Sequence, residues 1–331
     1  MNSPNESKAN IRILVIRLSS LGDVMLTEPL VRALRAKYPE AQIDFVVRTE
    51  YADVLRNIAG ISRLFLLDVS QPNALRELRG KLKHERYTHV LDLHNNFRSR
   101  ALRKLPAAKL SVIDKRSLKR WLLVKFKINL LKDAPDIVGR YFEVARGLGI
   151  VDDRSAPMLT NTTTAIPTRV AIAPGSRHWN KQWPEEYFIE LVRKFIAEDY
   201  TVDLLGSNDE AALASRIVSA VNSSNVTNYA GRLSIAESIE QLKQASFAVT
   251  NDSGLMHICA ALGIRTVAIF GPTVREFGFM PRAVNVTIVE NAGLYCRPCT
   301  AIGRDDCPEK HFRCMREICV EEVIANSVSE S

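Results

Sequence analysis

The sequence contains no apolar run long enough to cross a membrane. Its longest apolar stretches, such as residues 11–18, are interrupted by arginine and fall far short of the roughly 18 residues that a membrane-spanning helix needs. Residues 1–10 are polar, lack the apolar core of a secretory leader, and are interpreted as a frayed lead-in. We therefore expect a cytoplasmic protein with no transmembrane helix.

Cysteine is scarce except near the end of the chain. Cys259 stands alone, and five further thiols follow residue 290: Cys296, Cys299, Cys307, Cys314 and Cys319. Cytoplasmic thiols are expected to be reduced. The Cys296-x-x-Cys299 spacing is typical of zinc ligands and His311 lies nearby, but the later spacings are irregular. We expect no metal, with Cys296, Cys299, Cys307 and Cys314 as the candidate ligands if one binds, and we interpret the segment as a structural clip.

Acidic residues are nearly absent from residues 98–132. Twelve Lys or Arg and the single acid Asp114 give this window a charge of +11, so the rest of the chain carries −3 of the total of +8. Such a patch favours an anionic partner, which could be a nucleic acid, an acidic lipid surface or a phosphorylated substrate.

Apolar residues interleave with the cations inside this window, namely Leu118, Trp121, Leu122, Leu123 and Phe126. The pattern fits an amphipathic helix that lies on anionic lipid. It fits equally a helix that packs on its own domain with the basic residues outward. The sequence leaves both alternatives open.

Strand-like and helix-like segments alternate along the 331 residues. Apolar runs occur at 11–18, 42–48, 63–68, 87–93 and 109–113, and again at 169–173, 200–205, 247–250, 265–270 and 284–289. Amphipathic stretches between them include 24–38, 51–58, 74–83, 185–198, 210–221, 235–244 and 255–262. This alternation predicts an α/β protein with parallel sheets. A Pro- and Thr-containing segment, 152–168, divides it into two doubly wound domains, 1–160 and 161–331, which we expect to face a cleft.

The loop after the first strand lacks the spaced glycines of a dinucleotide fingerprint and the Gly-Lys-Ser/Thr of a P-loop. It retains Ser20, Gly22 and Asp23 immediately before a predicted helix. Ligands of open α/β sheets bind at the carboxyl ends of the strands, so Asp23 is a candidate for chemistry. Aspartate also caps helices well, and taken alone Asp23 fits that role better.

Two loops of the second half have the composition of phosphate sites. The first contains Gly175, Ser176 and Arg177, with Lys181 close behind, and offers backbone N–H groups, a hydroxyl and cations to a diphosphate. The second contains Asp252, Ser253 and Gly254 and leads into a helix that carries His257, as a ligand or as a packing residue. The segment 270–273, Phe-Gly-Pro-Thr, is expected on the same side of the site.

These four loops together resemble the family 9 glycosyltransferases, typified by ADP-heptose:lipopolysaccharide heptosyltransferases. The Ser-Ser-Leu-Gly-Asp, Pro-Gly-Ser, Asn-Asp-Ser-Gly and Phe-Gly-Pro-Thr motifs appear in the family's order, between about residues 11 and 320. The resemblance implies the GT-B fold, in which two Rossmann-like domains face a cleft, the first on the acceptor side and the second binding the nucleotide-sugar donor.

The resemblance also implies roles for particular residues. Asp23 corresponds to the family's general base, and Ser20 and Gly22 lie beside it on the acceptor side. The donor is expected at Gly175, Ser176, Arg177, Lys181, Asp252, Ser253, Gly254 and His257, with Asp209 or Glu210 near the ribose. Asn95, Arg98 and Arg100 follow a predicted strand and are candidates for contact with the anionic acceptor.

The implied reaction is an inverting transfer of heptose or a related sugar, with a nucleotide sugar, ADP-heptose first, as co-substrate and no cofactor. Lys181 and the loop N–H groups would neutralise the leaving diphosphate without a metal. The acceptor would be the anionic core of lipopolysaccharide at the cytoplasmic face of the inner membrane. A sugar-nucleotide epimerase or hydrolase on the same scaffold is the alternative. A protein that only binds nucleic acid fits less well, because no aromatic stacking platform is evident.

Overall fold

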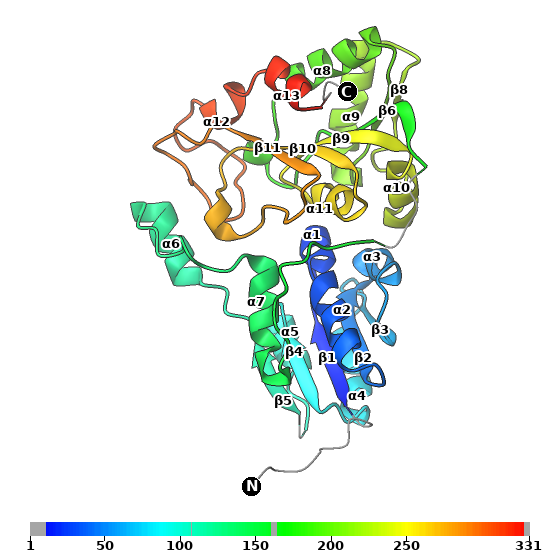
Figure 1. Cartoon of the computed structure of the whole chain (residues 1–331), viewed down its shortest axis with the longest axis vertical. Coiled ribbons are helices and arrows are strands. Elements are labelled where there is room, and N and C mark those ends of the chain that lie inside the picture. The colour runs from blue at the N-terminus through cyan, green and yellow to red at the C-terminus, as the bar shows by residue number, and fades with distance from the viewer. Residues whose placement is uncertain (1–10, 107, 160–163, 328–331) are drawn as a thin grey trace. The chain divides into compact units, whose positions relative to one another are not determined.

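The computed structural model describes residues 11–106, 108–159 and 164–327. The predicted lead-in at 1–10 and part of the predicted linker lie outside the described residues. The chain divides into two compact units (Figure 1). Unit 1 comprises Met1–Lys115 and Pro135–Thr160, and unit 2 comprises Arg116–Ala134 and Asn161–Ser331.

Unit 1 is built on five parallel strands in the order β3-β2-β1-β4-β5. The strands are β1 (Arg12–Ile16), β2 (Gln42–Arg48), β3 (Arg63–Leu67), β4 (His89–Asp92) and β5 (Lys109–Val112). The helices are α1 (Leu21–Met25), α2 (Glu28–Lys37), α3 (Ala52–Arg56), α4 (Ala74–His84), α5 (Phe97–Leu102) and α7 (Ile137–Val144), with short 3-10 turns η2 (Thr49–Tyr51) and η3 (Arg146–Leu148). The parallel α/β organisation predicted for this half is present.

Helices cover both faces of this sheet (Figure 1). Leu14 and Ile16 of β1 pack with Leu78 of α4 and Leu102 of α5 in one core cluster, and α2 and α7 lie together on the other face. Residues 13–16 of β1 are fully buried, as expected for an apolar strand covered on both sides. The strand order reverses between β1 and β4, so the loops that follow these two strands diverge there and leave room for a ligand.

The predicted helix over 24–38 is wrong in one respect, because the structure has two helices there. Helix α1 ends at Met25, and Pro29 lies in the first turn of α2. Proline has no N–H to donate and is tolerated only in a first turn, so it starts a new helix. The Thr27 hydroxyl, which donates to the Val24 carbonyl at 2.7 Å, closes the junction.

Unit 2 has six parallel strands in the order β11-β10-β9-β6-β7-β8. They are β6 (Ile166–Ala173), β7 (Thr201–Leu204), β8 (Val226–Asn228), β9 (Ala245–Asn251), β10 (Arg265–Phe270) and β11 (Val286–Glu290). The helices are α6 (Ser117–Phe126), α8 (Glu185–Ala197), α9 (Ala211–Val221), α10 (Ile235–Leu242), α11 (Gly254–Ala261), α12 (Arg313–Arg316) and α13 (Val320–Ser327), with 3-10 turns η4 (Trp179–Lys181), η5 (Asn208–Glu210) and η6 (Arg275–Phe277).

The core of unit 2 also has two layers of helices (Figure 1). Helices α8, α9, α12 and α13 contribute to the large cluster on one face, which includes Phe188, Ile217, Met315 and Val323. Met256 of α11 packs against Ala268 and Phe270 of β10 on the other face. Here the strand order reverses between β6 and β9, which places the two predicted phosphate loops at the reversal. Within the described ranges, no helix is both long and apolar enough to span a membrane.

Candidate active site

Asp23 lies at the third position of α1, at the point where the sheet of unit 1 reverses its order. The backbone N–H and the hydroxyl of Ser20 donate to its Oδ2 at 3.3 and 2.9 Å. The short helix therefore begins with a capping box, the structural role that the sequence allowed for Asp23. This role occupies one of the two carboxylate oxygens.

A buried arginine makes the other strong contact with Asp23. Arg17 Nη2 lies 2.7 Å from Asp23 Oδ2 and Arg17 Nη1 donates to the Leu93 carbonyl at 2.6 Å, so this side chain joins the ends of β1 and β4. The ring of Tyr141 faces the guanidinium at 5.8 Å, and its hydroxyl donates to the Asp23 carbonyl at 3.2 Å. Among the described residues, Asp23 Oδ1 has no hydrogen-bond partner although it is buried.

The charge state of Asp23 follows from these contacts. Burial raises its pKa, but the charge of Arg17 and the hydrogen bonds from Ser20 outweigh burial, and the pKa of the carboxyl lies below its ordinary value. Asp23 is therefore ionised at neutral pH, with Oδ2 bound to Arg17 and Ser20 and Oδ1 buried without a hydrogen-bond partner among the described residues. A carboxylate in this state can accept a proton from a hydroxyl.

His94 completes this part of the site and was not predicted from the sequence. It directly follows β4, its N–H donates to Asp92 Oδ1 at 2.9 Å, and its buried Nδ1 has no partner within the part of the chain that the structure describes. Burial, followed by the charges of Arg17 and Lys115, lowers the pKa of His94 to about 4. The imidazole is thus neutral at physiological pH. Arg17 and His94 follow β1 and β4, the two strands between which the strand order reverses. A polar residue just after such a strand is the sequence feature that could have indicated both.

The predicted acceptor-side residues occupy different surroundings. Ser20 is exposed and Gly22 is buried in α1. Asn95 is tied into the turn after β4, because its amide donates to the Ile113 carbonyl at 3.1 Å.

The two predicted arginines lie on α5. Arg98 stacks on Phe97 at 4.5 Å. Arg100 lines a basic hollow of about 530 Å³ with Arg79, Ala101, Arg103 and Lys104.

The predicted donor loops meet in unit 2, where three loops follow adjacent strands. Lys181 Nζ lies 2.5 Å from Asp252 Oδ2, and the hydroxyl of Thr273, from the loop after β10, donates to the same oxygen at 2.8 Å. The Ser176 hydroxyl donates to the Asp252 carbonyl at 3.4 Å. Asp252 therefore connects the loops after β6 and β10.

Asn251 holds these loops together and was not among the predicted site residues. Its amide donates to the carbonyls of Pro174 and Gly175 at 2.7 and 3.3 Å, and its oxygen accepts from the Trp183 N–H at 3.1 Å. The side chain is fully buried. An asparagine at the end of a buried strand was the available signal.

The start of α11 offers donors to an anion. Ser253 is its N-cap residue but makes no side-chain cap, and its buried hydroxyl oxygen has no partner among the residues that the structure places. Gly254 opens the helix, and the buried His257 lies one turn inside it. The free N–H groups of the first turn and the helix dipole favour a phosphate here.

Glu210, and not Asp209, lies against the Pro-Gly-Ser turn. A Cβ on Gly175 would collide with the Glu210 carboxyl group, so glycine permits this close approach. Glu210 Oε2 accepts from the Ser207 N–H at 2.6 Å at the start of η5. Asp209 and Arg177 are exposed. Glu210 therefore lies beside the predicted phosphate loop and Asp209 does not, a difference that the sequence alone did not show.

The cysteine-rich segment packs behind the donor loops. Cys296 Sγ and His311 Nε2 are 3.9 Å apart, Cys307 Sγ accepts from the Phe312 N–H at 3.3 Å, and Cys314 is buried in the core, where burial raises its pKa to about 12. All six thiols are free. Across the described ranges, no group of three or more His, Cys, Asp or Glu is placed to hold a metal ion, the predicted candidate ligands included.

One arginine of this segment supports the site directly. Arg297 is buried, and its Nη2 donates to the Thr273 carbonyl at 2.7 Å and to Glu290 Oε2 at 2.6 Å. Because Thr273 in turn holds Asp252, the segment stabilises the donor loops. This contact agrees with the interpretation of the segment as a clip.

Known proteins resemble this chain in sequence and in fold. Lipopolysaccharide heptosyltransferase 2 of Escherichia coli is 29% identical over 295 residues, which cover 81% of this chain and 84% of the relative. The solved E. coli ADP-heptose lipopolysaccharide heptosyltransferase II matches with a TM-score of 0.72 at 24% identity, over 94% of this chain and 99% of that one. An E. coli heptosyltransferase solved with ADP-2-deoxy-2-fluoro heptose matches with a TM-score of 0.68 at 22% identity, over 88% and 96% of the two chains.

Two Rossmann-like units with loops of this composition at their strand-order reversals define a glycosyltransferase of the GT-B fold. Residues 75–310 match the model of glycosyltransferase family 9 (heptosyltransferase), and the chain belongs to that family. The fold and the family expected from the sequence are confirmed.

Proposed function

We propose that this chain transfers a heptose from ADP-heptose to the inner core of lipopolysaccharide, with inversion at the anomeric carbon. Membership of family 9 supports transfer of a sugar. The named substrates of the E. coli relatives support the choice of donor and acceptor. The solved complex of a structural neighbour with an ADP-heptose analogue supports the same donor.

Asp23 is the general base in this proposal, and the observation that carries it is an ionised carboxylate whose Oδ1 has no hydrogen-bond partner among the described residues. The acceptor hydroxyl gives its proton to Oδ1 as its oxygen attacks the anomeric carbon. As this bond forms, the bond from that carbon to the diphosphate breaks, and the electron pair leaves with ADP. Arg17 keeps the carboxylate ionised beforehand, so no prior deprotonation is needed.

Unit 2 binds the donor in this proposal. Lys181 and the N–H groups at the start of α11 face the diphosphate and stabilise the charge that develops as it leaves. The orphaned Ser253 hydroxyl supplies a further hydrogen bond. Glu210, which lies beside Gly175, is the better placed of the two acids for the ribose hydroxyls.

Unit 1 then serves the acceptor, which carries phosphates and carboxylates. Arg98, Arg100 and Asn95, together with Ser20 and Gly22 beside the base, remain the proposed contacts. Lipid-anchored lipopolysaccharide precursors place the reaction at the cytoplasmic face of the inner membrane. The enzyme is accordingly proposed to work there as a peripheral protein.

The function is tested by incubating the protein with ADP-heptose, or separately with UDP-sugars, and deeply truncated lipopolysaccharide. We expect nucleotide release together with an acceptor heavier by one heptose. Release of nucleotide without an acceptor would identify a sugar-nucleotide hydrolase instead, and no transfer from any donor would refute the proposal.

The role of Asp23 is tested by Asp23→Asn. Turnover should fall by about two to four powers of ten, the usual contribution of a general base, while ADP binding stays unchanged. Asp44→Asn is a matched control, because Asp44 is also a buried aspartate of unit 1 paired with an arginine, Arg63. The control should lose stability and keep turnover per folded molecule. Equal behaviour of the two variants would leave Asp23 as a helix cap only.

A further inference from the structure

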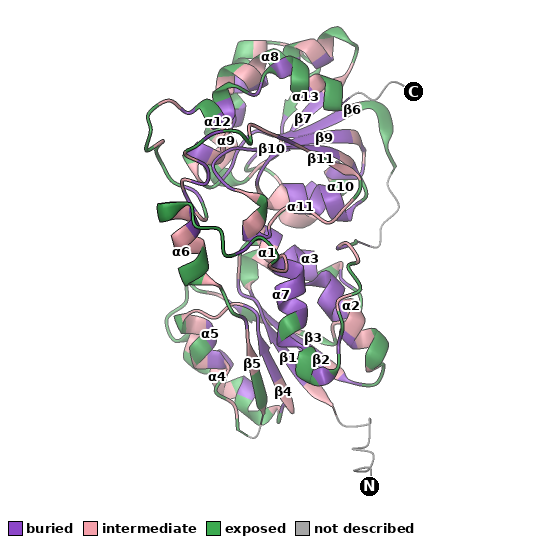
Figure 2. Ribbon diagram, turned by 60° about the vertical axis from the view of Figure 1, so that its left-hand side comes forward, coloured by how far each residue is buried: buried purple, intermediate pink, exposed green. Residues whose placement is uncertain are grey.

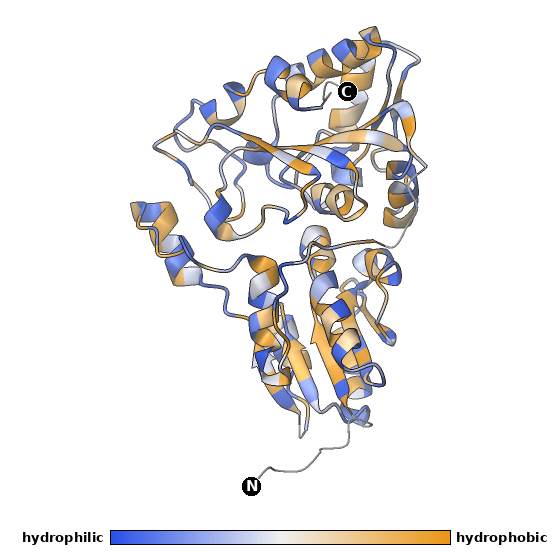
Figure 3. Cartoon of the chain, viewed as in Figure 1, coloured by the Kyte–Doolittle hydropathy of each residue, from blue (hydrophilic) through white to orange (hydrophobic). Residues whose placement is uncertain are grey.

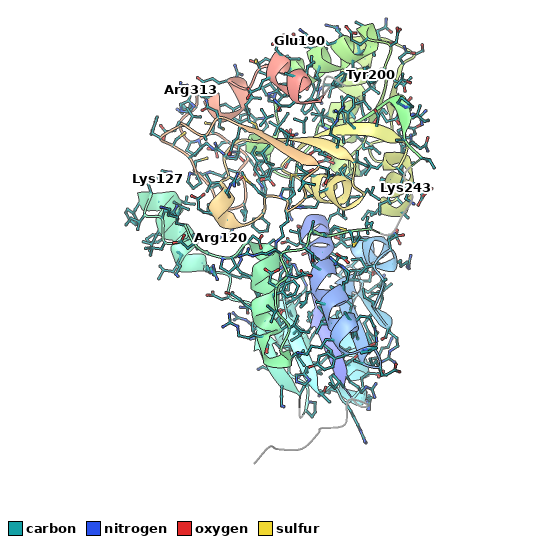
Figure 4. The ribbon with its side chains drawn as sticks, in the orientation of Figure 1. Arg120, Lys127, Glu190, Tyr200, Lys243 and Arg313 are labelled. Carbon is teal, nitrogen blue, oxygen red and sulfur yellow. The ribbon has the colours of Figure 1, made fainter. Side chains whose placement is uncertain are left out.

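Helix α6 is attached to unit 2 by one of its faces. Leu123 is buried with Leu131 and Phe277 in a small apolar cluster. Arg120 Nη2 donates to the Ala301 carbonyl at 2.6 Å, and Lys127 Nζ donates to the carbonyls of Cys296 and Pro298 at 2.9 and 2.7 Å. Figure 4 labels Arg120, which lies on α6, and Lys127, which follows directly at its C-terminal end. The helix therefore has a fixed orientation on unit 2.

The face of α6 away from this cluster carries exposed side chains, most of them apolar. Exposed and hydrophobic residues are both visible along the helix (Figures 2 and 3). Positions 118, 121, 122 and 125 follow helical spacing and share this face. Five large apolar side chains here and in the following turn are about half exposed or more: Leu118 (68%), Trp121 (52%), Phe126 (55%), Ile128 (49%) and Leu130 (53%). A contiguous exposed set of this kind is unusual for a surface that meets only water.

The cations around this face are available to a partner. Lys119, Lys125 and Lys132 are exposed, and within the described part of the chain they form no ion pair. No acidic residue occurs between positions 115 and 132. The face therefore combines apolar side chains with uncompensated positive charge.

We propose that α6 and residues 127–130 form a docking surface for an anionic lipid bilayer. Trp121, Phe126 and Leu118 enter the boundary between headgroups and acyl chains, and the lysines contact the anionic headgroups. Charge selects this partner over a second copy of the chain, because two such faces would bring like charges together. Delivery of a lipid-anchored acceptor to Asp23 would follow, and that part of the inference rests on the proposed function.

The surface is tested by flotation of the full-length protein with vesicles of phosphatidylethanolamine and phosphatidylglycerol, compared with phosphatidylcholine alone. We expect binding to the anionic vesicles only, and loss of binding near 1 M salt, where the screening length falls to about 3 Å. Lys119→Gln with Lys125→Gln should weaken binding by roughly 30-fold, since each lysine near a charged membrane contributes about fivefold. Lys81→Gln with Lys83→Gln, two exposed lysines of unit 1, is the charge-matched control.

The apolar part of the surface needs its own variants. Leu118→Ser with Trp121→Ser should lower vesicle affinity by about tenfold or more. Val151→Ser with Val284→Ser removes two other highly exposed side chains and should leave affinity unchanged. In a Trp179→Phe background, lipids brominated in their acyl chains should quench Trp121 fluorescence.

These measurements do not depend on turnover, so failure of the surface and failure of the proposed function are distinguishable. Equal binding to neutral vesicles, no quenching of Trp121, or equal loss in the control variants would overturn the proposal. So would concentration-dependent dimerisation that the Leu118 and Trp121 changes abolish without vesicles. If both ideas hold, the α6 variants lose transfer to acceptor in vesicles and retain it with a delipidated, soluble acceptor.

Discussion

Arg17 controls the protonation of Asp23 and gives a prediction for the pH dependence of activity. In Arg17→Gln the positive charge is lost while the burial that raises the carboxyl pKa remains, so the pKa of Asp23 should rise above its ordinary value of 3.8. The acid limb of the kcat/KM profile should then lie at higher pH than in the wild type. Profiles of both proteins from pH 4.5 to 8 on a soluble acceptor measure the shift, in roughly half-unit steps.

A matched variant separates this effect from general damage. Arg63→Gln removes a guanidinium that pairs with Asp44 and Glu85. It should leave the acid limb where it is in the wild type. Coincident profiles for the wild type and Arg17→Gln would show that Arg17 does not control the base.

His94 predicts a dependence of stability on pH. Its pKa in the folded state, about 4, lies below the 6.5 of a free histidine. As the pH falls through 6.5, the unfolded chain takes up a proton that the folded chain refuses, so the free energy of unfolding falls by about 2 kcal/mol between pH 7 and 5. His94→Gln should remove this part of the decrease.

Urea unfolding at pH 7 and pH 5 measures the effect of His94. His84→Gln is the control, because His84 is an exposed residue of α4. An unchanged difference between the two pH values in His94→Gln would contradict a buried, neutral imidazole.

The site residues proposed from the sequence stand in recognisable loops, whereas residues that contact them only through packing were not among the predictions. Asp23, Lys181 and Asp252 occur in motifs that can be read locally. Arg17 and Asn251 end apolar strands, and only the fold shows which carboxylate or carbonyl each one meets. The choice of Glu210 over Asp209 likewise depends on the missing Cβ of Gly175.

The attachment of α6 gives a prediction at the level of the element. Leu123→Ala should loosen α6 from its small cluster, because a truncated buried leucine loses packing that the surroundings only partly recover. Hydrogen exchange should then increase by about tenfold or more across residues 116–134, while the core strands of unit 2 stay protected. Leu118→Ala, at an exposed position of the same helix, should leave hydrogen exchange unchanged both across residues 116–134 and in the core strands of unit 2.

Most strands were predicted well, including the short β5 and β7, whereas several helices were not. Strands β1, β2, β9 and β10 lie within or close to their predicted ranges. Helix α5 has only six residues, too few to show a helical period, and relies on the Asn96 cap. The sequence also could not assign residues 116–134 to unit 2, because the packing of Leu123 on Phe277 joins segments far apart in the chain.

At the scale of the whole molecule, the two units should respond differently to nucleotide. ADP should slow hydrogen exchange in unit 2, at residues 174–181 and 251–257, because these loops are the proposed diphosphate site. The loop of Asp23 in unit 1 should show much less protection from ADP alone. Exchange measured by mass spectrometry with and without ADP makes the comparison, and protection centred on residues 17–25 would place the nucleotide in the wrong unit.

The α/β class with two parallel sheets was the most predictable feature. Alternating strands and helices indicate parallel sheets, and such sheets place their ligands at a reversal of strand order, which the structure has at β1/β4 and at β6/β9. The order of the strands themselves is not written in local periodicity. It depends on which apolar edges pair, and the fold alone gives it.

The two oxygens of Asp23 have different roles, and this has a consequence for selectivity. A sugar acceptor presents several hydroxyls of nearly equal acidity, so chemistry alone does not distinguish them. If Asp23 is the general base, Arg17 and Ser20 hold Oδ2 and the proton of the acceptor hydroxyl goes to Oδ1. The proposed mechanism therefore predicts that transfer favours the acceptor hydroxyl whose O–H bond points at Oδ1.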